Sequence, residues 1–323
     1  MKKFFSFLLI ASIVGVTLFG CKKEDVNPNT TFKNGMSIRH FENFLELKSE
    51  MDNITDMDFD ELLEYESELN FNSYGKNAYL LVEELTGDTT MLSGEMLSQI
   101  EQYYPQYFVI LEEDTNFLVD VRYGNTPFSF IMNENRMFII GDSVYKVFDN
   151  CLVITDIANI EDLTALDEDG LLEIDGNEEY IVLYYQEEEA KTNYDKSLCV
   201  DSINGKEKVK TCLVLTEMYR FSHNGDTKSH FCLSFKIRGF RKFCGIFWPV
   251  KRTLSNDILC RVSINNESYW GANQGSSSGF VREVYPIWLT NVVTPQYYRP
   301  EYYISYAVGY GRTPAAIAVY NYQ

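Results

Sequence analysis

The sequence predicts an α+β protein, with a small helical and mixed N-terminal unit followed by a mainly antiparallel, β-sandwich-like C-terminal unit. Over residues 41–69, apolar residues recur at mostly three- to four-residue spacing between acids, which is typical of amphipathic helices. After residue 107, short runs of β-branched and aromatic residues are separated by Asn, Gly and Asp, which predicts strands joined by turns. Residues 21–200 hold 11 Lys and Arg against 39 Asp and Glu, whereas residues 201–323 hold 15 against 8. Such a charge asymmetry predicts two units.

The N-terminus has the features of a secretory signal. A pair of lysines precedes an apolar run over residues 4–19, and Gly20 stands before Cys21. This run is shorter than the roughly 20 residues that a membrane-spanning helix needs. Its end, LFGC, resembles a lipobox, at which the cysteine thiol receives a diacylglyceryl group and the signal is cleaved. We therefore predict a signal peptide over residues 1–20 and an acylated, palmitate-bearing Cys21. An uncleaved anchor helix is the alternative.

Residues 21–38 are predicted to be a lipidated tether, because their polar composition buries too little surface to fold. The KED segment at residues 23–25 resembles the short acidic export signal of surface lipoproteins in the Bacteroidota, although any soluble tether would also be charged. The expected location is the outer membrane, with the protein anchored by lipid on the cell surface or on the periplasmic face.

Charge also limits the partners. The acidic unit would repel polyanions, so no nucleic acid is expected as a partner. The basic unit could bind the acidic unit or surface phosphates such as those of lipopolysaccharide. Lys236, Ile237 and Arg238 alternate in polarity, which predicts that the two charged side chains lie on the solvent-exposed face of a strand. Solubility alone is the alternative explanation of the charge in both units.

Six cysteines remain if Cys21 is lipidated, and five of them lie between residues 199 and 260. An even number in an oxidising compartment allows up to three disulfides. The sequence has no Cys-x-x-Cys pair, which argues against the simplest zinc and redox sites, and no metal or cofactor is predicted. Buried free thiols are the alternative. The candidate disulfide cysteines are Cys151, Cys199, Cys212, Cys232, Cys244 and Cys260.

The helices are predicted near the N-terminus. Residues 41–69 form two helices, the second capped by Asp58 or Asp60, and residues 93–104 form another that Pro105 ends. Strands follow at residues 107–111, 117–121, 128–132, 137–140, 144–148, 152–154 and 180–185, and then at 209–221, 230–240, 245–250, 258–264, 280–289 and 302–308.

A polar, like-charged run at residues 186–189 is predicted to be a linker. It separates an acidic α+β domain, residues 39–190, from a β-rich, Cys- and Tyr-rich domain, residues 200–323. Strands spaced this way without helical periods predict an antiparallel sandwich for the second domain.

Two segments carry a resemblance to a known group. They are FENFLELKSEMDNITDMDFDELLEYESELNFNS (residues 41–73) and NENRMFIIGDSVYKVFDNCLVI (residues 133–154). Both are similar to uncharacterised lipoproteins of Bacteroidota, in which a helical N-terminal unit precedes a hairpin of the type I-x-D-x-V-Y-K. The resemblance covers roughly residues 1–155 and implies export and anchoring. It supplies no activity and no catalytic residue.

Three further motifs partly match known kinds of site. GSSSG at residues 275–279 matches the hydrolase nucleophile elbow, but it lacks a preceding strand, a following helix and a later histidine, so it is interpreted as a flexible loop. His223 and His230 flank a turn and could face each other as a weak metal site. Acidic turns at residues 167–170 and 175–178 lack the glutamate that an EF-hand needs at loop position 12, which leaves an irregular calcium loop or ordinary acidic turns as the alternatives.

Aromatic residues are abundant near the C-terminus, and their amphipathic rings suit stacking on sugars or anchoring of a protein. We therefore expect a non-enzymatic surface or envelope module that binds a glycan or an envelope or host protein. An exported hydrolase that uses carboxylates and a purely structural envelope component are the alternatives. Ordinary packing of tyrosine in strands is another explanation of these aromatic residues. The candidate ligand-binding aromatics are Tyr269, Trp270, Trp288, Tyr297 and Tyr298.

Overall fold

The structure is a computed structural model with an α+β fold, as the sequence predicted. It describes residues 29–31, 37–87, 93–113, 116–123, 128–174, 176–184, 197–223, 226–243, 245–264, 267–293, 298–299, 303–304, 306–310, 314–317 and 320–321. The predicted signal peptide and Cys21 lie outside these ranges. None of the described helices has the length and apolar character needed to cross a membrane.

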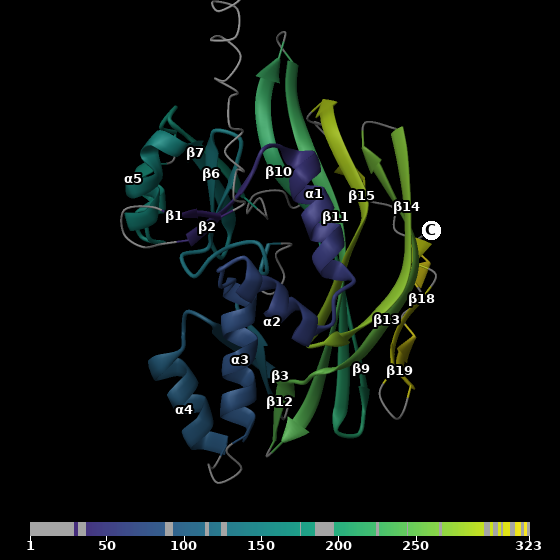
Figure 1. The fold of residues 1–323 in the computed structure, drawn as a ribbon. Coiled ribbons are helices and arrows are strands. Elements are labelled where there is room, and N and C mark those ends of the chain that lie inside the picture. Colours follow the sequence, from purple (N-terminus) through teal and green to yellow (C-terminus); the bar gives the residue numbers. More distant parts are fainter. Residues whose placement is uncertain are drawn as a thin grey trace, which may run out of the picture.

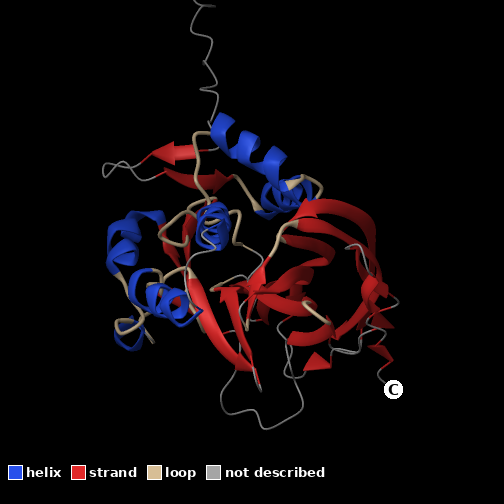
Figure 2. Cartoon of the chain, turned by 90° about the horizontal axis from the view of Figure 1, so that it is seen from below, coloured by secondary structure: helices blue, strands red, loops and turns tan. Residues whose placement is uncertain are grey.

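The helices lie mainly in the N-terminal part, on one side of the long strands (Figures 1 and 2). Two of them start at capping residues, of which the sequence predicted the second. Asn43 accepts hydrogen bonds from the backbone N–H groups of Leu45 and Glu46, and Asp58 forms a capping box with Glu61. The helices are α1 (Phe44–Thr55), α2 (Phe59–Glu68), α3 (Tyr74–Gly87), α4 (Ser93–Tyr103), α5 (Ile160–Ala165) and α6 (Leu171–Ile174), with a 3-10 turn η1 (Ile157–Asn159).

The strands form three main sheets, which we name here. The N-terminal sheet has the order β1-β2-β5-β6-β7-β8, the central sheet β3-β4-β12-β11-β10-β9 with β15 paired to β11, and the outer sheet β14-β13-β18-β19 with β16 paired to β13. A small fourth sheet pairs β17 with β20.

The strand bounds in the N-terminal part are β1 (Asn29–Thr31), β2 (Ser37–Phe41), β3 (Phe108–Glu113), β4 (Asn116–Val121), β5 (Met137–Ile140), β6 (Ser143–Val147), β7 (Cys151–Asp156) and β8 (Tyr180–Tyr184). The later strands are β9 (Ser197–Asn204), β10 (Glu207–His223), β11 (Asp226–Phe243), β12 (Ile246–Pro249), β13 (Arg252–Ile264), β14 (Glu267–Gly279), β15 (Val281–Val293), β16 (Tyr298–Arg299), β17 (Tyr303–Ile304), β18 (Tyr306–Tyr310), β19 (Pro314–Ile317) and β20 (Tyr320–Asn321). Pairing is antiparallel apart from β2 with β5 and β4 with β12 among the described pairs.

The central sheet joins the two ranges that the sequence suggests as domains. Strand β4, from residues 39–190, pairs with β12, from residues 200–323, through Phe117 and Ile246. The largest hydrophobic cluster also takes buried side chains from both ranges, including Val119 and Trp248. The domain division stays a prediction, and any separation of the two ranges in solution would have to break this shared sheet and core.

Two charged side chains on β11 are buried, so the prediction that they face solvent is wrong. Lys236 and Arg238 are 1 % and 2 % exposed. Lys236 forms an ion pair with Glu283 at 3.0 Å, and Arg238 forms one with Asp120 at 2.5 Å. The alternation in polarity is real, but the carboxylates come from strands of the same sheet, Glu283 from β15 and Asp120 from β4. Buried charge of this kind is tolerated only when it is paired.

Three of the candidate disulfide cysteines are free thiols, so that expectation is wrong for them. Cys151, Cys232 and Cys260 are buried, and each belongs to a different hydrophobic cluster, which separates them from one another. Cys212 is disulfide-bonded, and the residue opposite it in the β9–β10 ladder is Cys199. The side chain of Cys199 and the whole of Cys244 lie outside the described parts of the chain.

The GSSSG segment is strand, and its interpretation as a flexible loop is wrong. It forms the end of β14, where Gly275 pairs with Asn256 and Gly279 with Arg252 of β13. A nucleophile elbow needs a sharp turn into a helix, which an unbroken antiparallel strand does not offer. Gly275 is required in this strand, because an added Cβ would lie 2.3 Å from Arg282 Nη2.

The I-x-D-x-V-Y-K hairpin places its last residue under a helix. Lys146 is 3 % exposed, and its Nζ donates to the carbonyls of Leu163 and Thr164 at 3.0 Å each and of Leu166 at 2.6 Å. These carbonyls end α5 and have no partner within the helix, so a cation there satisfies them and complements the helix dipole. Burial lowers the pKa of Lys146 to about 8.

We expect Lys146→Met to lower the free energy of unfolding by about 1.5–3 kcal/mol, because it leaves buried carbonyls without their charged donor. Urea denaturation measures the loss, and amide exchange in α5 should rise more than elsewhere. Lys206→Met, at an exposed position, is the matched control. An equal, small effect of both substitutions would show that Lys146 does not support α5.

Candidate functional site

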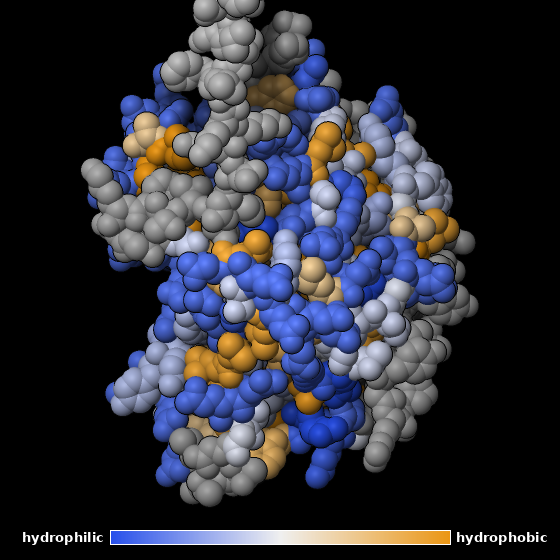
Figure 3. Space-filling view, in the orientation of Figure 1, coloured by the Kyte–Doolittle hydropathy of each residue, from blue (hydrophilic) through white to orange (hydrophobic). Residues whose placement is uncertain are grey.

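A groove lies between α1 and the two strands β14 and β15, with a volume of about 730 Å³. In Figure 3 hydrophobic surface is visible between the positions of α1 and β14, among mainly hydrophilic side chains. Its lining comes from α1 (Lys48, Asp52, Thr55 and Asp56), from β14 (Ser268, Tyr269, Trp270, Ala272 and Asn273) and from β15 (Tyr285, Pro286, Ile287, Trp288 and Leu289).

The groove forms because consecutive strands belong to different sheets. β14 pairs with β13 in the outer sheet, and β15 pairs with β11 in the central sheet, while the described ladders do not join β14 to β15. The two strands nevertheless come very close at one point. A Cβ atom on Gly271 would lie 2.1 Å from the carbonyl oxygen of Pro286, so only glycine fits there.

Arg282 fixes α1 over the two strands. Its side chain is 1 % exposed. Its Nη1 donates to the carbonyl of Thr55 at the end of α1 at 2.9 Å, its Nε to Asn256 Oδ1 at 2.6 Å, and its Nη2 to Asp56 Oδ1 at 3.3 Å. Thr55 also donates from Oγ1 to the carbonyl of Glu283 at 2.6 Å. These buried polar contacts therefore hold α1 and the strands, which form the walls of the groove, in place.

Three of the five candidate aromatics line this groove. Trp270 is 55 % exposed, and Tyr269 and Trp288 are partly buried. The hydroxyl of Tyr269 donates to Glu267 Oε2 at 2.6 Å. Tyr297 lies outside the described residues, and for Tyr298 only the backbone, in β16, is described.

The α1 side of the groove was missed by the sequence analysis. Asp52 forms an ion pair with Lys48, and the Asp56 side chain is 79 % exposed. Tyr285 adds a further ring; it is 8 % exposed, and burial raises its pKa well above the ordinary value. The spacing of its apolar residues predicted α1 as an amphipathic helix. Such a helix exposes one face wherever it packs, so the spacing alone cannot predict that this face lies beside β14.

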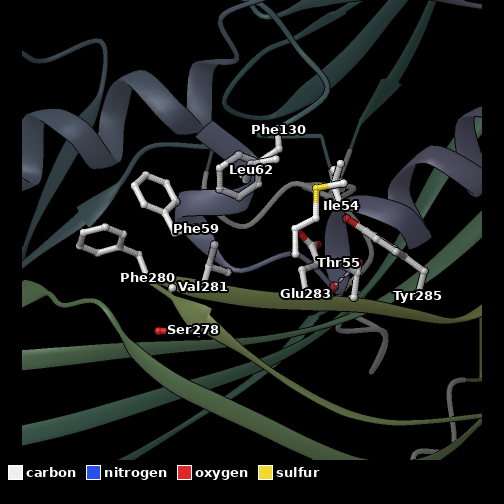
Figure 4. A pocket seen from close by; sticks show the side chains of 12 residues that line it. Ile54, Thr55, Phe59, Leu62, Phe130, Ser278, Phe280, Val281, Glu283 and Tyr285 are labelled. Atoms are coloured by element: carbon white, nitrogen blue, oxygen red, sulfur yellow. Dashed lines mark hydrogen bonds between the residues drawn. The ribbon is translucent and has the colours of Figure 1, made fainter. Parts of the chain in front are cut away.

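A smaller pocket adjoins the groove and shares Thr55 and Tyr285 with it. Its volume is about 40 Å³. Most of its walls are apolar, from α2 and from the connection between β14 and β15, and the carboxylate of Glu283 points into it (Figure 4). Glu283 Oε2 lies 3.0 Å from Lys236 Nζ, and Oε1 is buried among the described residues.

The described residues do not bring the other sequence candidates together as sites. His223 lies opposite Asp226 in the β10–β11 ladder and His230 opposite Tyr219, so the two histidines are not cross-strand partners. The described residues contain no cluster of three or more His, Cys, Asp or Glu side chains with metal-binding geometry. In the acidic turn at residues 167–170, Asp167 accepts from the backbone N–H of Gly170 at 2.9 Å, which is an ordinary turn contact.

His230 packs among aromatic rings, including Phe44 of α1 at a centroid distance of 4.6 Å, and its Nδ1 accepts from the N–H of Asn291 at 3.1 Å. Burial lowers the pKa of this histidine below its ordinary value.

We expect His230 to make the fold less stable in mild acid. Because the folded-state pKa is depressed, the unfolded chain takes up the proton first, from about pH 6.5 downward. The free energy of unfolding should therefore be retained above pH 6.5 and fall as the pH drops, by at most about 1.4 kcal/mol per pH unit for one group. Urea denaturation at pH 7.5 and 5.5 measures this, and His230→Gln should flatten the profile. An unchanged profile in the variant would contradict the role of His230.

Comparison with known proteins adds little to this geometry. No family model matches the sequence, and no curated protein matches it. Among solved structures, the fold is similar to that of a DUF4848 family protein from Bacteroides thetaiotaomicron, with 13 % identity and a TM-score of 0.30, covering 84 % of this chain and 89 % of that one. That family is a domain family of unknown function.

Proposed function

We propose that this chain is an exported, non-enzymatic module, anchored by lipid through Cys21 in the outer membrane, that binds an oligosaccharide in the groove between α1, β14 and β15. The observation that carries the proposal is the gathering of Tyr269, Trp270 and Trp288 with two carboxylates in one groove. Aromatic rings stack on the apolar faces of sugar rings, and carboxylates accept hydrogen bonds from sugar hydroxyls.

The size of the groove favours an oligosaccharide over a protein partner. A volume of about 730 Å³ falls in the range of small-molecule sites, roughly 300–1,000 Å³. A stable protein interface covers about 800 Å² on each partner, so a protein would also have to contact surface outside the groove. The groove also contains polar groups from α1 and β14, which an apolar protein anchor would leave without hydrogen bonds.

The charges in the groove favour an uncharged ligand. Lys48 and Asp52 neutralise each other, and Asp56 lies 3.3 Å from the buried guanidinium of Arg282. With each carboxylate beside a cation, the groove offers hydrogen-bond acceptors without a strong net field. Neutral sugars, rich in hydroxyl donors, match this arrangement better than polyanionic chains do.

Binding is tested by titrating the purified chain with neutral oligosaccharides and following tryptophan fluorescence and heat. We expect Trp270→Ala to weaken binding by about tenfold or more, since a stacked ring contributes about 0.5–1.5 kcal/mol beyond its buried area. Tyr103→Ala is the matched control, because Tyr103 is 59 % exposed on α4 and does not line the groove. Equal binding by both variants would contradict the proposal.

The same titrations test the alternative of a hydrolase that uses carboxylates. Release of new reducing ends from any bound oligosaccharide would show that the protein is an enzyme and would contradict a purely binding role. A glycosidase needs two carboxyl groups placed across the scissile bond. Asp52 and Asp56 of the groove are the residues to substitute in that case.

The anchor and the location need their own experiment. Labelled palmitate should be incorporated into the chain, and Cys21→Ser should abolish the label. Digestion by protease on intact cells would place the body on the cell surface, where foreign glycans are the available ligands. Protection until the outer membrane is permeabilised would place it in the periplasm and restrict the ligand to envelope glycans.

A further inference from the structure

The groove has two different ends, and the directions of its walls show which residues belong to each. Helix α1 lies beside β15 (Figure 1). The start of α1 lies at the end of β15, because the ring of Phe44 packs on His230, whose Nδ1 accepts from the N–H of Asn291 at 3.1 Å. The end of α1 lies at the start of β15, where Thr55 Oγ1 donates to the carbonyl of Glu283 at 2.6 Å. We call these the first-turn end and the last-turn end of the groove.

Strand β14 runs in the opposite direction to β15 across the groove. Gly271 lies beside Pro286, since an added Cβ would be 2.1 Å from the carbonyl oxygen of that proline. Gly275 lies beside Arg282, where an added Cβ would be 2.3 Å from Nη2. The residues before Gly271 therefore lie toward the first-turn end, and those after it lie toward the last-turn end. Trp270 accordingly belongs to the first-turn end.

The first-turn end is apolar. Leu45 is 71 % exposed and Trp270 is 55 % exposed, and Leu289 lines the groove at the same end. Leu45 lies on the same stripe of α1 as Asp52 and Asp56, because seven and eleven residues make about two and three turns of a helix. It therefore continues the α1 wall beyond the part that Asp52 lines. Exposed apolar side chains that gather at one end of a groove form a surface for an apolar part of a ligand.

The last-turn end is polar. The side chain of Asp56 is 79 % exposed, and its Oδ1 lies 3.3 Å from Nη2 of Arg282. Asn273 lines the groove at this end, and its Oδ1 accepts from an asparagine of β13 at 2.8 Å. The ion pair of Lys48 and Asp52 lies between the two ends. The groove therefore changes from polar to apolar over about 16 Å, the rise of eleven helical residues.

We propose that the groove binds a glycoside with an apolar aglycone, an alkyl or aryl group. The inference rests on the proposed function, because it gives the bound sugar a direction in the groove. The sugar rings lie between Asp56 and the aromatic side chains, and the aglycone extends past Trp270 to Leu45 and Leu289. A free oligosaccharide would leave this apolar end in contact with water. Each methylene group of the aglycone that becomes fully buried strengthens binding by about fourfold.

The test titrates the purified chain with the methyl, hexyl and phenyl β-glycosides of maltose, lactose and diacetylchitobiose, and of any other neutral sugar that binds. All are used below the concentrations at which they form micelles. We expect the hexyl or the phenyl form of a bound sugar to bind at least about tenfold more tightly than its methyl form. The tighter of the two identifies the aglycone as alkyl or aryl.

The other outcomes separate this inference from the proposed function. Equal binding of the three forms would overturn the inference and leave the proposed function standing. Absence of binding to all these glycosides and to other neutral oligosaccharides would remove both. Hexanol is the control for the apolar chain alone, and binding of hexanol as tight as that of the hexyl glycosides would remove the sugar from the groove, and both proposals with it.

A variant pair then places the aglycone at the first-turn end. Leu45→Ser removes exposed apolar surface there, so the preference for the hexyl or phenyl form should fall by at least about fivefold, while the methyl form binds as before. Leu172→Ser is the matched control, because Leu172 is 83 % exposed on α6 and does not line the groove. An unchanged preference in Leu45→Ser, or an equal loss in both variants, would overturn the assignment. Both leucines are exposed, so both variants should keep the fold, which thermal unfolding checks.

Discussion

Replacing Asp120 with alanine should lower the free energy of unfolding by about 3–5 kcal/mol, the cost of leaving a buried charge without its partner. Asp120 is 3 % exposed, and its Oδ1 accepts from Arg238 Nη1 at 2.5 Å. Its other oxygen lies 4.0 Å from Lys210 Nζ. The substitution therefore removes the carboxylate from two cations, of which Arg238 is 2 % exposed.

Asp149→Ala is the matched control for this loss. Asp149 pairs with Arg122 at 2.5 Å, but the two side chains are 45 % and 31 % exposed. Water screens such a pair, so we expect a change of at most about 1 kcal/mol. Urea denaturation of both variants measures the difference. Similar values would mean that the Asp120–Arg238 pair contributes no more than a surface ion pair does.

The Asp120–Arg238 pair also shows what the sequence could not predict. The alternation Lys236-Ile237-Arg238 predicts a strand, and β11 is a strand. It cannot say whether the polar face meets water or carboxylates, because the partner of Arg238 lies 118 positions away in sequence. Local pattern fixes which residues share a face, whereas burial of that face depends on contacts between distant segments.

The helices were easier to predict, because the contacts that define them are local in the sequence. Asp58 caps α2 by contacts within four residues, so its signal is local and complete in the sequence. The third helix, α3, was not predicted, although buried Ala78, Val82 and Leu85 have helical spacing. The sequence therefore contains the signal for α3 as well.

The candidate site could be predicted only in part. Composition singled out Tyr269, Trp270 and Trp288, because large rings near the C-terminus are conspicuous in any sequence. The opposite wall comes from α1, and its contact with β15 joins Thr55 to Glu283 across 228 positions. The pocket around Glu283 likewise needs α2 and β15 together, which no local pattern reveals.

Gly271→Ala should cost about 3 kcal/mol of unfolding free energy or more, because the added Cβ would lie 2.1 Å from the carbonyl oxygen of Pro286 and 2.6 Å from a side-chain atom of Ile287. A flexible side chain could move aside, but the Pro286 carbonyl belongs to the backbone of β15, which is tied to β11 along its length. The two strands must therefore move apart beside the groove, which Pro286 helps to line. Urea denaturation measures the loss, and oligosaccharide titration should show weaker binding in whatever fraction remains folded.

Gly94→Ala is the control that separates this contact from the general effect of adding a methyl group. Gly94 lies in the first turn of α4, and outside its own helix backbone and its chain neighbours no described heavy atom lies within 4 Å of an added Cβ. Alanine is the better residue in a helix by about 0.5–1 kcal/mol, so this variant should be unchanged or slightly more stable. A small effect at Gly271 as well would mean that β14 and β15 are farther apart in solution. The groove that the proposed function requires would then be wider in solution than the structure has it.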